Sequence, residues 1–285
     1  MSMIRSLGHD AVRGFTLIES IIVILLIGIL AAVAAVFIVE PFRAATDTVR
    51  RAELVESAET AMDRMTREIR IAVPNSIRRH DSGNALELLR APKGGRYRRL
   101  RAQGGGGDTL NRAQSNDTFD VLGGLGSDVE LRGAGRDCAA GAGDCMVIAN
   151  TGTTGFDAYA EDNVAAIVDA TPDTNDPANL EFDTGGQGAP EAFPAHSPRQ
   201  RFQVIDTVVR YVCENDRINR YFGYGLNESP DDDKSSRLAT DVEDCDFQYD
   251  SGAGQRHGLV TIDLTISRDG ETVRLVDQAH VVNVP

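Results

Sequence analysis

The chain has 285 residues and a formal net charge of −14, and its length allows one large domain with an appended element or two small domains. The charge is unevenly distributed, because the balance is +5 from Met1 to Arg101 and −19 over the remaining residues. An acidic C-terminal body argues against nucleic acid as the main partner, since phosphate binding needs a basic footprint.

The first element in chain order is an apolar run at residues 15–39, FTLIESIIVILLIGILAAVAAVFIV, whose one charged residue is Glu19. As a helix it would span about 37 Å, against about 30 Å of bilayer hydrocarbon. No small-residue cleavage site follows Val39, so an ordinary secretory signal peptide is not favoured. Because Arg5 and Arg13 precede the run, the positive-inside rule predicts a cytoplasmic N-terminus and an external C-terminal body.

Glu19 needs an explanation, since a carboxylate inside a spanning helix costs about 3 kcal/mol on insertion scales. Its position near the start of the run would let the side chain reach the membrane interface. Alternatively, the carboxylate pairs with a cation.

Residues 13–19, Arg-Gly-Phe-Thr-Leu-Ile-Glu, resemble the prepilin cleavage motif of type IV pilins and type II secretion pseudopilins. The resemblance implies a leader peptide at residues 1–14, cleavage between Gly14 and Phe15, and N-methylation of the new Phe15 amine. That amine has a reference pKa of about 8 and is mostly cationic near neutral pH. Glu19 would neutralise it either in a neighbouring subunit or within one chain, and the sequence leaves both arrangements open.

The resemblance also implies partners, namely prepilin peptidase, other major and minor pilin subunits, the inner-membrane assembly platform and the inner membrane itself. It implies a single-pass inner-membrane protein with a periplasmic body that later joins a pilus or pseudopilus. We expect no catalytic residues, no metal, no cofactor and no nucleic acid. The chain is not expected to be an enzyme, because no nucleophile–base pair, carboxylate dyad or zinc-like Cys/His spacing stands out.

Residues 15–40 are thus the predicted transmembrane and assembly helix, and residues 41–74 are predicted to continue it as an amphipathic helix. Pro41 is expected to kink the helix, and Pro74 to end it. Charged residues, including Glu68, are assigned to the wet side. Apolar residues recur at helical spacing and predict one buried stripe: Val55, Ala58, Met62, Met65, Ile69 and Val73.

Residues 75–285 read as a β-rich domain. The run Leu259–Ser267 alternates apolar and polar residues, Asp269-Gly270 is a hairpin turn signal, and residues 271–284 return. The predicted fold is therefore α+β and type IV pilin-like, with a long N-terminal α-helix packed on an antiparallel β-sheet body with long loops. Other short runs rich in apolar and β-branched residues are also predicted strands: Ala85–Arg90, Thr118–Leu122, Met146–Ala149, Val164–Val168 and Phe202–Cys213.

The four cysteines, Cys138, Cys145, Cys213 and Cys245, fit two disulfides in an oxidising compartment. We favour Cys138–Cys145, which closes a small loop, with Cys213–Cys245, which joins two strands, over the two other connectivities. An acidic run at residues 231–233 has the oxygen ligands that calcium prefers. It lacks the spacing of a known calcium loop, so a solvated turn is favoured.

Parts of the body look like the minor pilins of mannose-sensitive haemagglutinin (MSHA) pili. By resemblance, such subunits prime assembly and lie at or near the tip. Two alternatives stay open: a minor pseudopilin of type II secretion, and an adhesin whose long loops bind a surface. The segments that carry the likeness lie along most of the chain: residues 95–98, 119–123, 208–213 and 258–285.

Overall fold

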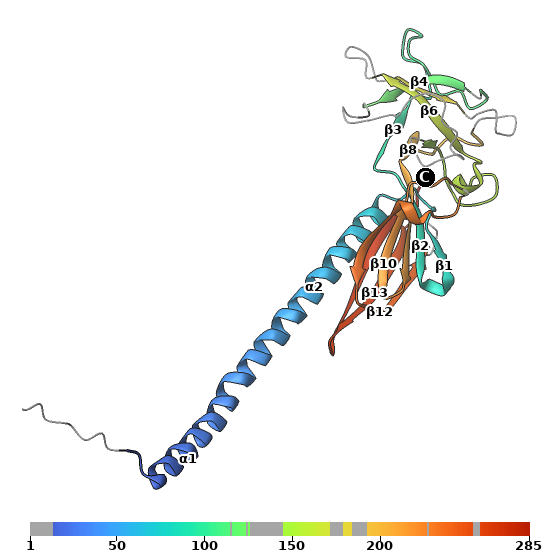
Figure 1. The fold of residues 1–285 in the computed structure, drawn as a ribbon. Helices are drawn as coiled ribbons and strands as arrows, with labels where there is room; N and C mark the ends of the chain where they lie inside the picture. The colour runs from blue at the N-terminus through green and yellow to red at the C-terminus, as the bar shows by residue number, and fades with distance from the viewer. Residues whose placement is uncertain are drawn as a thin grey trace, which may run out of the picture. The chain divides into compact units, whose positions relative to one another are not determined.

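A computed structural model describes residues 14–114, 116–123, 125, 145–171, 179–183, 193–226, 228–252 and 257–285 of the chain. The chain divides into two compact units, Met1–Ala52 and Glu53–Pro285. The first unit is helical from Leu17 onward, and the second contains the end of the long helix and all of the described strands. Figure 1 traces these elements along the chain.

The N-terminal unit is built from an apolar helix. α1 spans Leu17–Ala34 and has no buried residue. A π-helix, η1 (Ala35–Val39), follows, and α2 (Glu40–Arg70) begins directly after it. A proline lacks the backbone N–H that an α-helix needs, and π-turns are one of the usual ways in which a helix absorbs an irregularity. The irregular turn thus lies just before Pro41, where the sequence predicts a disturbance.

Within the second unit, α2 presents one apolar stripe to the core. Leu54, Ala58, Met62, Met65 and Ile69 are all buried, at the helical spacing that the sequence predicts. Val55 is only half-buried, and Leu54 takes its place. The helix ends at Arg70, four residues earlier than the predicted stop at Pro74.

The stripe packs against two antiparallel sheets that share one core with it. The five-stranded sheet contains, in spatial order, β1 (Arg78–His80), β2 (Ala85–Arg90), β9 (Thr207–Glu214), β10 (Arg217–Phe222) and β11 (Ser235–Thr240). The three-stranded sheet contains β12 (Val242–Asp250), β13 (His257–Arg268) and β14 (Glu271–Val282).

β13 and β14 form the hairpin that the sequence predicts. Val260, Ile262 and Leu264 are fully buried, and the residues between them are half-exposed. Asp269 and Gly270 both have positive φ angles, 51° and 87°, as a two-residue hairpin turn that matches the strand twist requires.

A closed six-stranded barrel is the part of the body that the sequence did not predict. Its strands, in spatial order, are β3 (Lys93–Tyr97), β4 (Asn116–Leu122), β7 (Asn179–Asp183), β6 (Val164–Thr171), β5 (Cys145–Val147) and β8 (Arg201–Ile205). Aromatic side chains fill its interior, and Tyr97, Phe119, Phe182, Phe193 and Phe202 are all at most 1% exposed. The barrel is therefore a packed core and not a channel.

The predicted single strand Phe202–Cys213 is two strands in two different sheets. Asp206 interrupts the run: its backbone N–H donates to the carbonyl of Arg90 at 3.1 Å, and its carboxylate pairs with the Arg90 guanidinium. β8 precedes this point in the barrel, and β9 follows it in the five-stranded sheet. Ala91-Pro92 makes the same passage between β2 and β3, where proline cannot donate a ladder hydrogen bond.

An asparagine network ties the end of the helical segment to the barrel loops and to the C-terminal strand. Asn75 donates through its side chain to the carbonyls of Asn150 (2.9 Å) and Asn283 (3.1 Å). Asn150 donates to the carbonyl of Pro74 at 2.6 Å. The half-buried amide of Asn75 and the buried amide of Asn150 thus both have partners from another element, which is the condition under which burying polar groups is tolerated.

Candidate processing and assembly site

The predicted cleavage bond lies in exposed, non-helical backbone. Gly14, Phe15 and Thr16 precede the first helical residue, Leu17. The Phe15 side chain is 79% exposed. A peptide bond in this setting can enter a peptidase active site without unwinding a helix.

The described part of the chain gives no structural reason for a glycine at position 14. A Cβ added there would meet no atom within 4 Å, and its φ lies outside the left-handed region that disfavours side chains. Among the described residues, neither packing nor backbone conformation therefore requires glycine at this position. A small residue there leaves the predicted cleavage bond open to a peptidase subsite.

Thr16 starts the helix. Its backbone is extended (φ −80°, ψ 152°), and its hydroxyl oxygen accepts a hydrogen bond from the backbone N–H of Glu19 at 3.3 Å. The backbone N–H of Ser20 donates to the Thr16 carbonyl at 3.2 Å. This is the geometry of an N-cap, which satisfies one of the donors that every helix start leaves unpaired.

Glu19 is the third residue of the helix, so Thr16 and Glu19 have the spacing of a capping box. A carboxylate in the first turn is stabilised by the partial positive charge of the helix N-terminus. No described residue forms an ion pair with Glu19 in this single chain. The position therefore suits both a local capping role and a charge that is open to a cation from outside.

The role of Thr16 as a helix cap is the functional feature that the sequence analysis missed. The signal was present, because Ser or Thr followed three residues later by Glu, directly before an apolar run, is typical of a helix start. The leader residues Arg5 and Arg13 lie outside the described residues, so the charge distribution before the helix stays a prediction.

The segment that follows is long and apolar enough to cross a membrane. Residues Leu17–Phe37 form a 21-residue span of mean hydropathy 3.1, with none of its most apolar window buried. At 1.5 Å per residue it is about 31 Å long, close to the thickness of bilayer hydrocarbon. Apolar side chains that are exposed over the whole span need another apolar environment, either lipid or the same helices of other subunits.

Comparison with known proteins gives a match for the N-terminal segment alone. Residues 10–35 match the family model described as the prokaryotic N-terminal methylation motif. No curated protein and no solved structure matches the chain. The matched motif supports a type IV pilin-like or pseudopilin-like subunit, with processing by prepilin peptidase and assembly with other pilins. The apolar helix and the motif together are consistent with anchoring in the inner membrane.

In the body, Cys213 and Cys245 form a disulfide with their Cα atoms 6.1 Å apart. The bond joins β9 to β12 and so links the five-stranded sheet to the three-stranded sheet. Cys138 lies outside the described residues, and Cys145 is not a free thiol. The predicted pairing of those two cysteines therefore stays a prediction.

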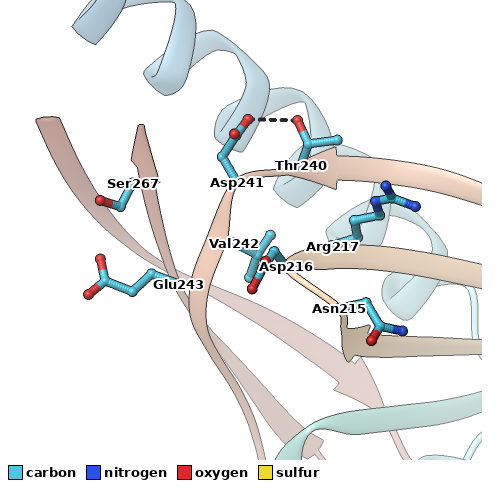
Figure 2. A pocket seen from close by; sticks show the side chains of 8 residues that line it. All are labelled: Asn215, Asp216, Arg217, Thr240, Asp241, Val242, Glu243 and Ser267. Atoms are coloured by element: carbon cyan, nitrogen blue, oxygen red, sulfur yellow. Dashed lines mark hydrogen bonds between the residues drawn. The ribbon is translucent and has the colours of Figure 1, made fainter. Parts of the chain in front are cut away.

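A surface hollow lies beside the two sheets, lined by residues at the ends of their strands (Figure 2). Its lining includes Asp216, Asp241 and Glu243. Asp241 is already engaged, because its carboxylate accepts from Arg268 at 2.7 Å and from Thr240 at 2.8 Å, and these contacts lower its pKa. Among the described residues, no group of three His, Cys, Asp or Glu side chains is arranged to hold a metal.

The acidic run at residues 231–233 forms a turn. The Asp231 carboxylate accepts a hydrogen bond from the backbone N–H of Asp233 at 3.1 Å and caps the short helix η4 (Asp232–Lys234). The three side chains are exposed. Local capping therefore accounts for this segment without a bound cation.

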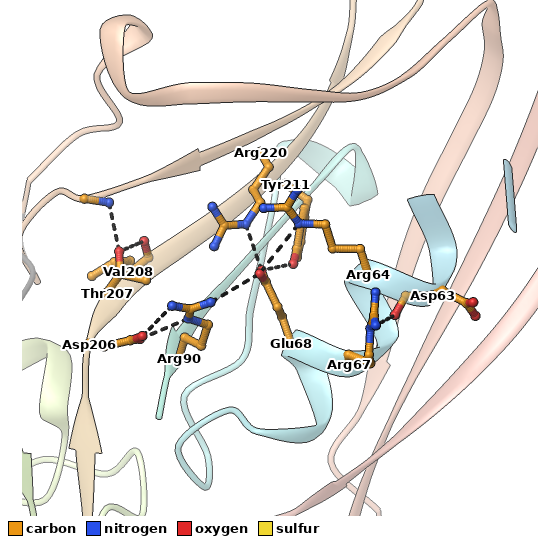
Figure 3. A network of polar contacts seen from close by, with 11 residues as sticks. Asp63, Arg64, Arg67, Glu68, Arg90, Asp206, Thr207, Val208, Tyr211 and Arg220 are labelled. Carbon is orange, nitrogen blue, oxygen red and sulfur yellow. Dashed lines mark hydrogen bonds and ion pairs between the residues drawn. The ribbon is translucent and has the colours of Figure 1, made fainter. Parts of the chain in front are cut away.

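A buried charge network fixes α2 to the five-stranded sheet (Figure 3). Glu68 accepts from Arg220 at 2.8 Å and from the Tyr211 hydroxyl, and Arg90 lies 3.5 Å from its other oxygen. Burial alone would raise the pKa of Glu68, but the hydrogen bonds from Arg220 and Tyr211 and the nearby arginine charges lower it. Burial, followed by the charge of Glu68, raises the pKa of Tyr211 well above its ordinary value.

The assignment of Glu68 to the wet side of the helix was wrong. Its side chain is buried, with 7% of the residue exposed, because its partners come from strands far along the sequence. A helical pattern alone marks a charged residue as exposed and cannot show a distant arginine that pairs with it.

Proposed function

We propose that this chain is a minor pilin-like structural subunit, not an enzyme, of a type IV pilus of the MSHA type. Prepilin peptidase would cleave it between Gly14 and Phe15, and the new Phe15 amine would be methylated. The mature chain would then assemble through its N-terminal helix. The observation that carries this proposal is the match of residues 10–35 to the methylation motif, on a helix whose cleavage bond is exposed and whose apolar residues are not buried.

The assignment to an MSHA-type pilus, as a minor subunit, rests on a sequence resemblance. Segments of the body look like MshO, a minor pilin-like component of MSHA pili, and the large body suits a minor subunit of an initiation or tip complex. The six-stranded barrel, with its own core, is the part of the large body that supports this position. A minor pseudopilin of type II secretion, similar to GspJ, is the second candidate and shares every feature of the N-terminal segment.

The proposal includes a membrane topology. The N-terminus would lie in the cytoplasm, and the body in the periplasm, before the subunit enters the filament. The Cys213–Cys245 disulfide supports an oxidising compartment for the body, since such bonds persist outside the reducing cytosol.

An adhesin at the tip is a further candidate, because the barrel provides a second folded core beside the one that packs on α2. A strain that lacks the subunit separates the two roles. Loss of filaments supports a structural role in priming, whereas intact filaments that no longer adhere support the adhesin.

Mass spectrometry of the mature N-terminus tests the central claim. We expect a chain that begins at Phe15 and carries one added methyl group, in cells that contain prepilin peptidase. In cells without the peptidase, the chain should keep residues 1–14. A mature chain that begins elsewhere, or that stays uncut beside an active peptidase, would contradict the proposal.

A further inference from the structure

Exposed arginines gather in β3, in the segment that follows it, and at the start of the neighbouring strand β8. Residues 93–101 contain four arginines, one lysine and no acidic residue, in a chain whose net charge is −14. Residues 199–201, which lie beside them on β8, add two more arginines. We call the exposed members of this cluster the arginine patch: Arg96, Arg99, Arg101, Arg199 and Arg201.

The strand register brings the patch together. Arg96 on β3 is paired directly with Arg201 on β8. The backbone N–H of Tyr97 donates to the carbonyl of Gln200 at 2.9 Å, so the two segments stay adjacent past the end of β3 and bring Arg199 close. Neighbouring strands are about 4.8 Å apart, so the side chains of the paired residues Arg96 and Arg201 begin at backbone positions that lie close together.

The alternation of side chains along β3 and β8 points Arg96 and Arg201 outward. Tyr97 and Phe202 are buried in the barrel interior, and their neighbours Arg96 and Arg201 must therefore lie on the outer face. Like charges directly opposite each other on neighbouring strands are destabilising. The fold thus keeps an arrangement that costs stability, on a face that packing does not explain.

The members of the patch have no ion-pair partner among the residues that the structure describes. Arg98, between them, is different, because Asp120 accepts from its Nε at 2.6 Å. With 43 acidic residues in the chain, carboxylates for further pairing are abundant. The five exposed guanidinium groups are therefore open to an anion from another molecule.

We propose that the arginine patch binds an acidic polysaccharide. Guanidinium groups form paired hydrogen bonds with carboxylate and sulfate groups, and several of them side by side favour a ligand with repeated charges over a single anion. Leu100, which is 78% exposed between Arg99 and Arg101, offers an apolar contact to the face of a sugar ring.

Two observations favour a polysaccharide over nucleic acid. Tyr97, the aromatic residue of segment 93–101, is buried, so this segment offers no exposed ring on which unpaired bases could stack. Duplex DNA carries one negative charge per about 1.7 Å, and a chain of net charge −14 repels so dense a polyanion more strongly than a sparsely charged glycan. The inference goes beyond the proposed function and does not depend on it.

Binding can be measured with the full chain in a non-ionic detergent and fluorescein-labelled oligomers of polygalacturonate, which carry one carboxylate per sugar. We expect saturable anisotropy changes that weaken as salt is added. The double variant R99Q/R101Q should weaken binding about tenfold, since two exposed charged contacts contribute up to about 1 kcal/mol each. Labelled neutral dextran should not bind.

A charge-matched control is the double variant R217Q/R237Q, which removes two exposed arginines from β10 and β11 of the five-stranded sheet. It should bind like the unchanged chain, and the melting temperatures of both variants should match it. Equal weakening by the two variants, or no saturable binding at low salt, would overturn the proposal. Stronger competition by a short DNA duplex than by unlabelled polygalacturonate would overturn the choice of partner. Processing at Gly14–Phe15 is measured separately, so its failure is not confused with failure here.

Discussion

The carboxylate of Glu68 accepts a hydrogen bond from the Nε of Arg220 at 2.8 Å, although the two residues are 152 positions apart in the chain. Glu68 belongs to the last turns of α2, and Arg220 to a central strand of the five-stranded sheet. With the Tyr211 hydroxyl on the same oxygen, this contact fixes the rotation of the helix on the sheet. An apolar stripe alone can slide or turn, whereas a buried ion pair has one satisfied arrangement.

Replacement of Glu68 by glutamine should destabilise the body by about 3 kcal/mol, because it leaves the buried guanidinium of Arg220 without its counter-charge. Glu56→Gln on the exposed side of the same helix should change stability by less than about 0.5 kcal/mol. Urea unfolding of the detergent-solubilised chain, followed by circular dichroism at pH 7, measures both. Equal effects of the two changes would remove the special role of the network.

The same pair predicts a pH dependence. The folded-state pKa of Glu68 is lowered below its reference value of 4.5, so its ionised form stabilises the fold. That contribution is complete above pH 4.5 and is lost as the pH falls through the folded-state pKa. The stability difference between the unchanged chain and Glu68→Gln should therefore shrink between pH 5 and pH 3. A difference that stays constant over this range would contradict the assignment.

The barrel depends on a close approach at Gly95. A Cβ there would lie 2.9 Å from two ring atoms of Phe202 and 3.0 Å from a methyl carbon of Val121. Both side chains are buried, so Gly95→Ala should cost about 1–3 kcal/mol through overpacking. Gly106→Ala is the matched control, since its Cβ would meet no atom within 4 Å. A melting temperature that is unchanged by Gly95→Ala would contradict the tight packing of Phe202 and Val121 against Gly95.

The disulfide between Cys213 and Cys245 closes a loop with a sequence separation of 32. Its removal in the double variant C213A/C245A should destabilise the body by about 3–4 kcal/mol, chiefly because the unfolded chain regains freedom. Unfolding in urea under non-reducing conditions measures the effect. A loss below about 1 kcal/mol would mean that the packing of the two sheets on α2 already holds these strands in place.

How much of this could be read from the sequence depends on the range of the interaction. The helix, its buried stripe and the hairpin from β13 to β14 depend on residues a few positions apart, so local periodicity and the Asp269-Gly270 turn predict them. The barrel depends on two breaks, at Pro92 and Asp206, that move both strands of a pair into another sheet. Nothing local to Asp206 distinguishes such a break from an ordinary polar residue in a strand.

The residues of the candidate site also differ in whether local sequence could predict them. Gly14, Phe15 and Glu19 could be proposed as site residues because the motif that carries them is contiguous. The structure places Gly14 and Phe15 in exposed backbone before the helix and Glu19 in its first turn, and their roles stay predictions. Glu68 was misplaced, because its partners Tyr211 and Arg220 lie more than 140 positions away. The arginines of segment 93–101 are visible in the sequence, but the contribution of Arg199 and Arg201 requires the register of β8 on β3.

Glu19 has two candidate roles, capping of the helix start and charge pairing with a cation, and two substitutions separate them. Glu19→Gln keeps the size of the side chain and removes its charge, so it should still insert in the membrane but enter filaments poorly, because the cationic Phe15 amine of the processed chain loses its counter-charge. Thr16→Ala removes the helix cap, at a cost of about 1 kcal/mol, and keeps the charge. Filament incorporation should therefore fall much further in Glu19→Gln than in Thr16→Ala, when both are compared by immunoblot of sheared filaments against total membrane. Equal losses would assign Glu19 to capping alone, and normal incorporation of Glu19→Gln would remove charge pairing from the account of assembly.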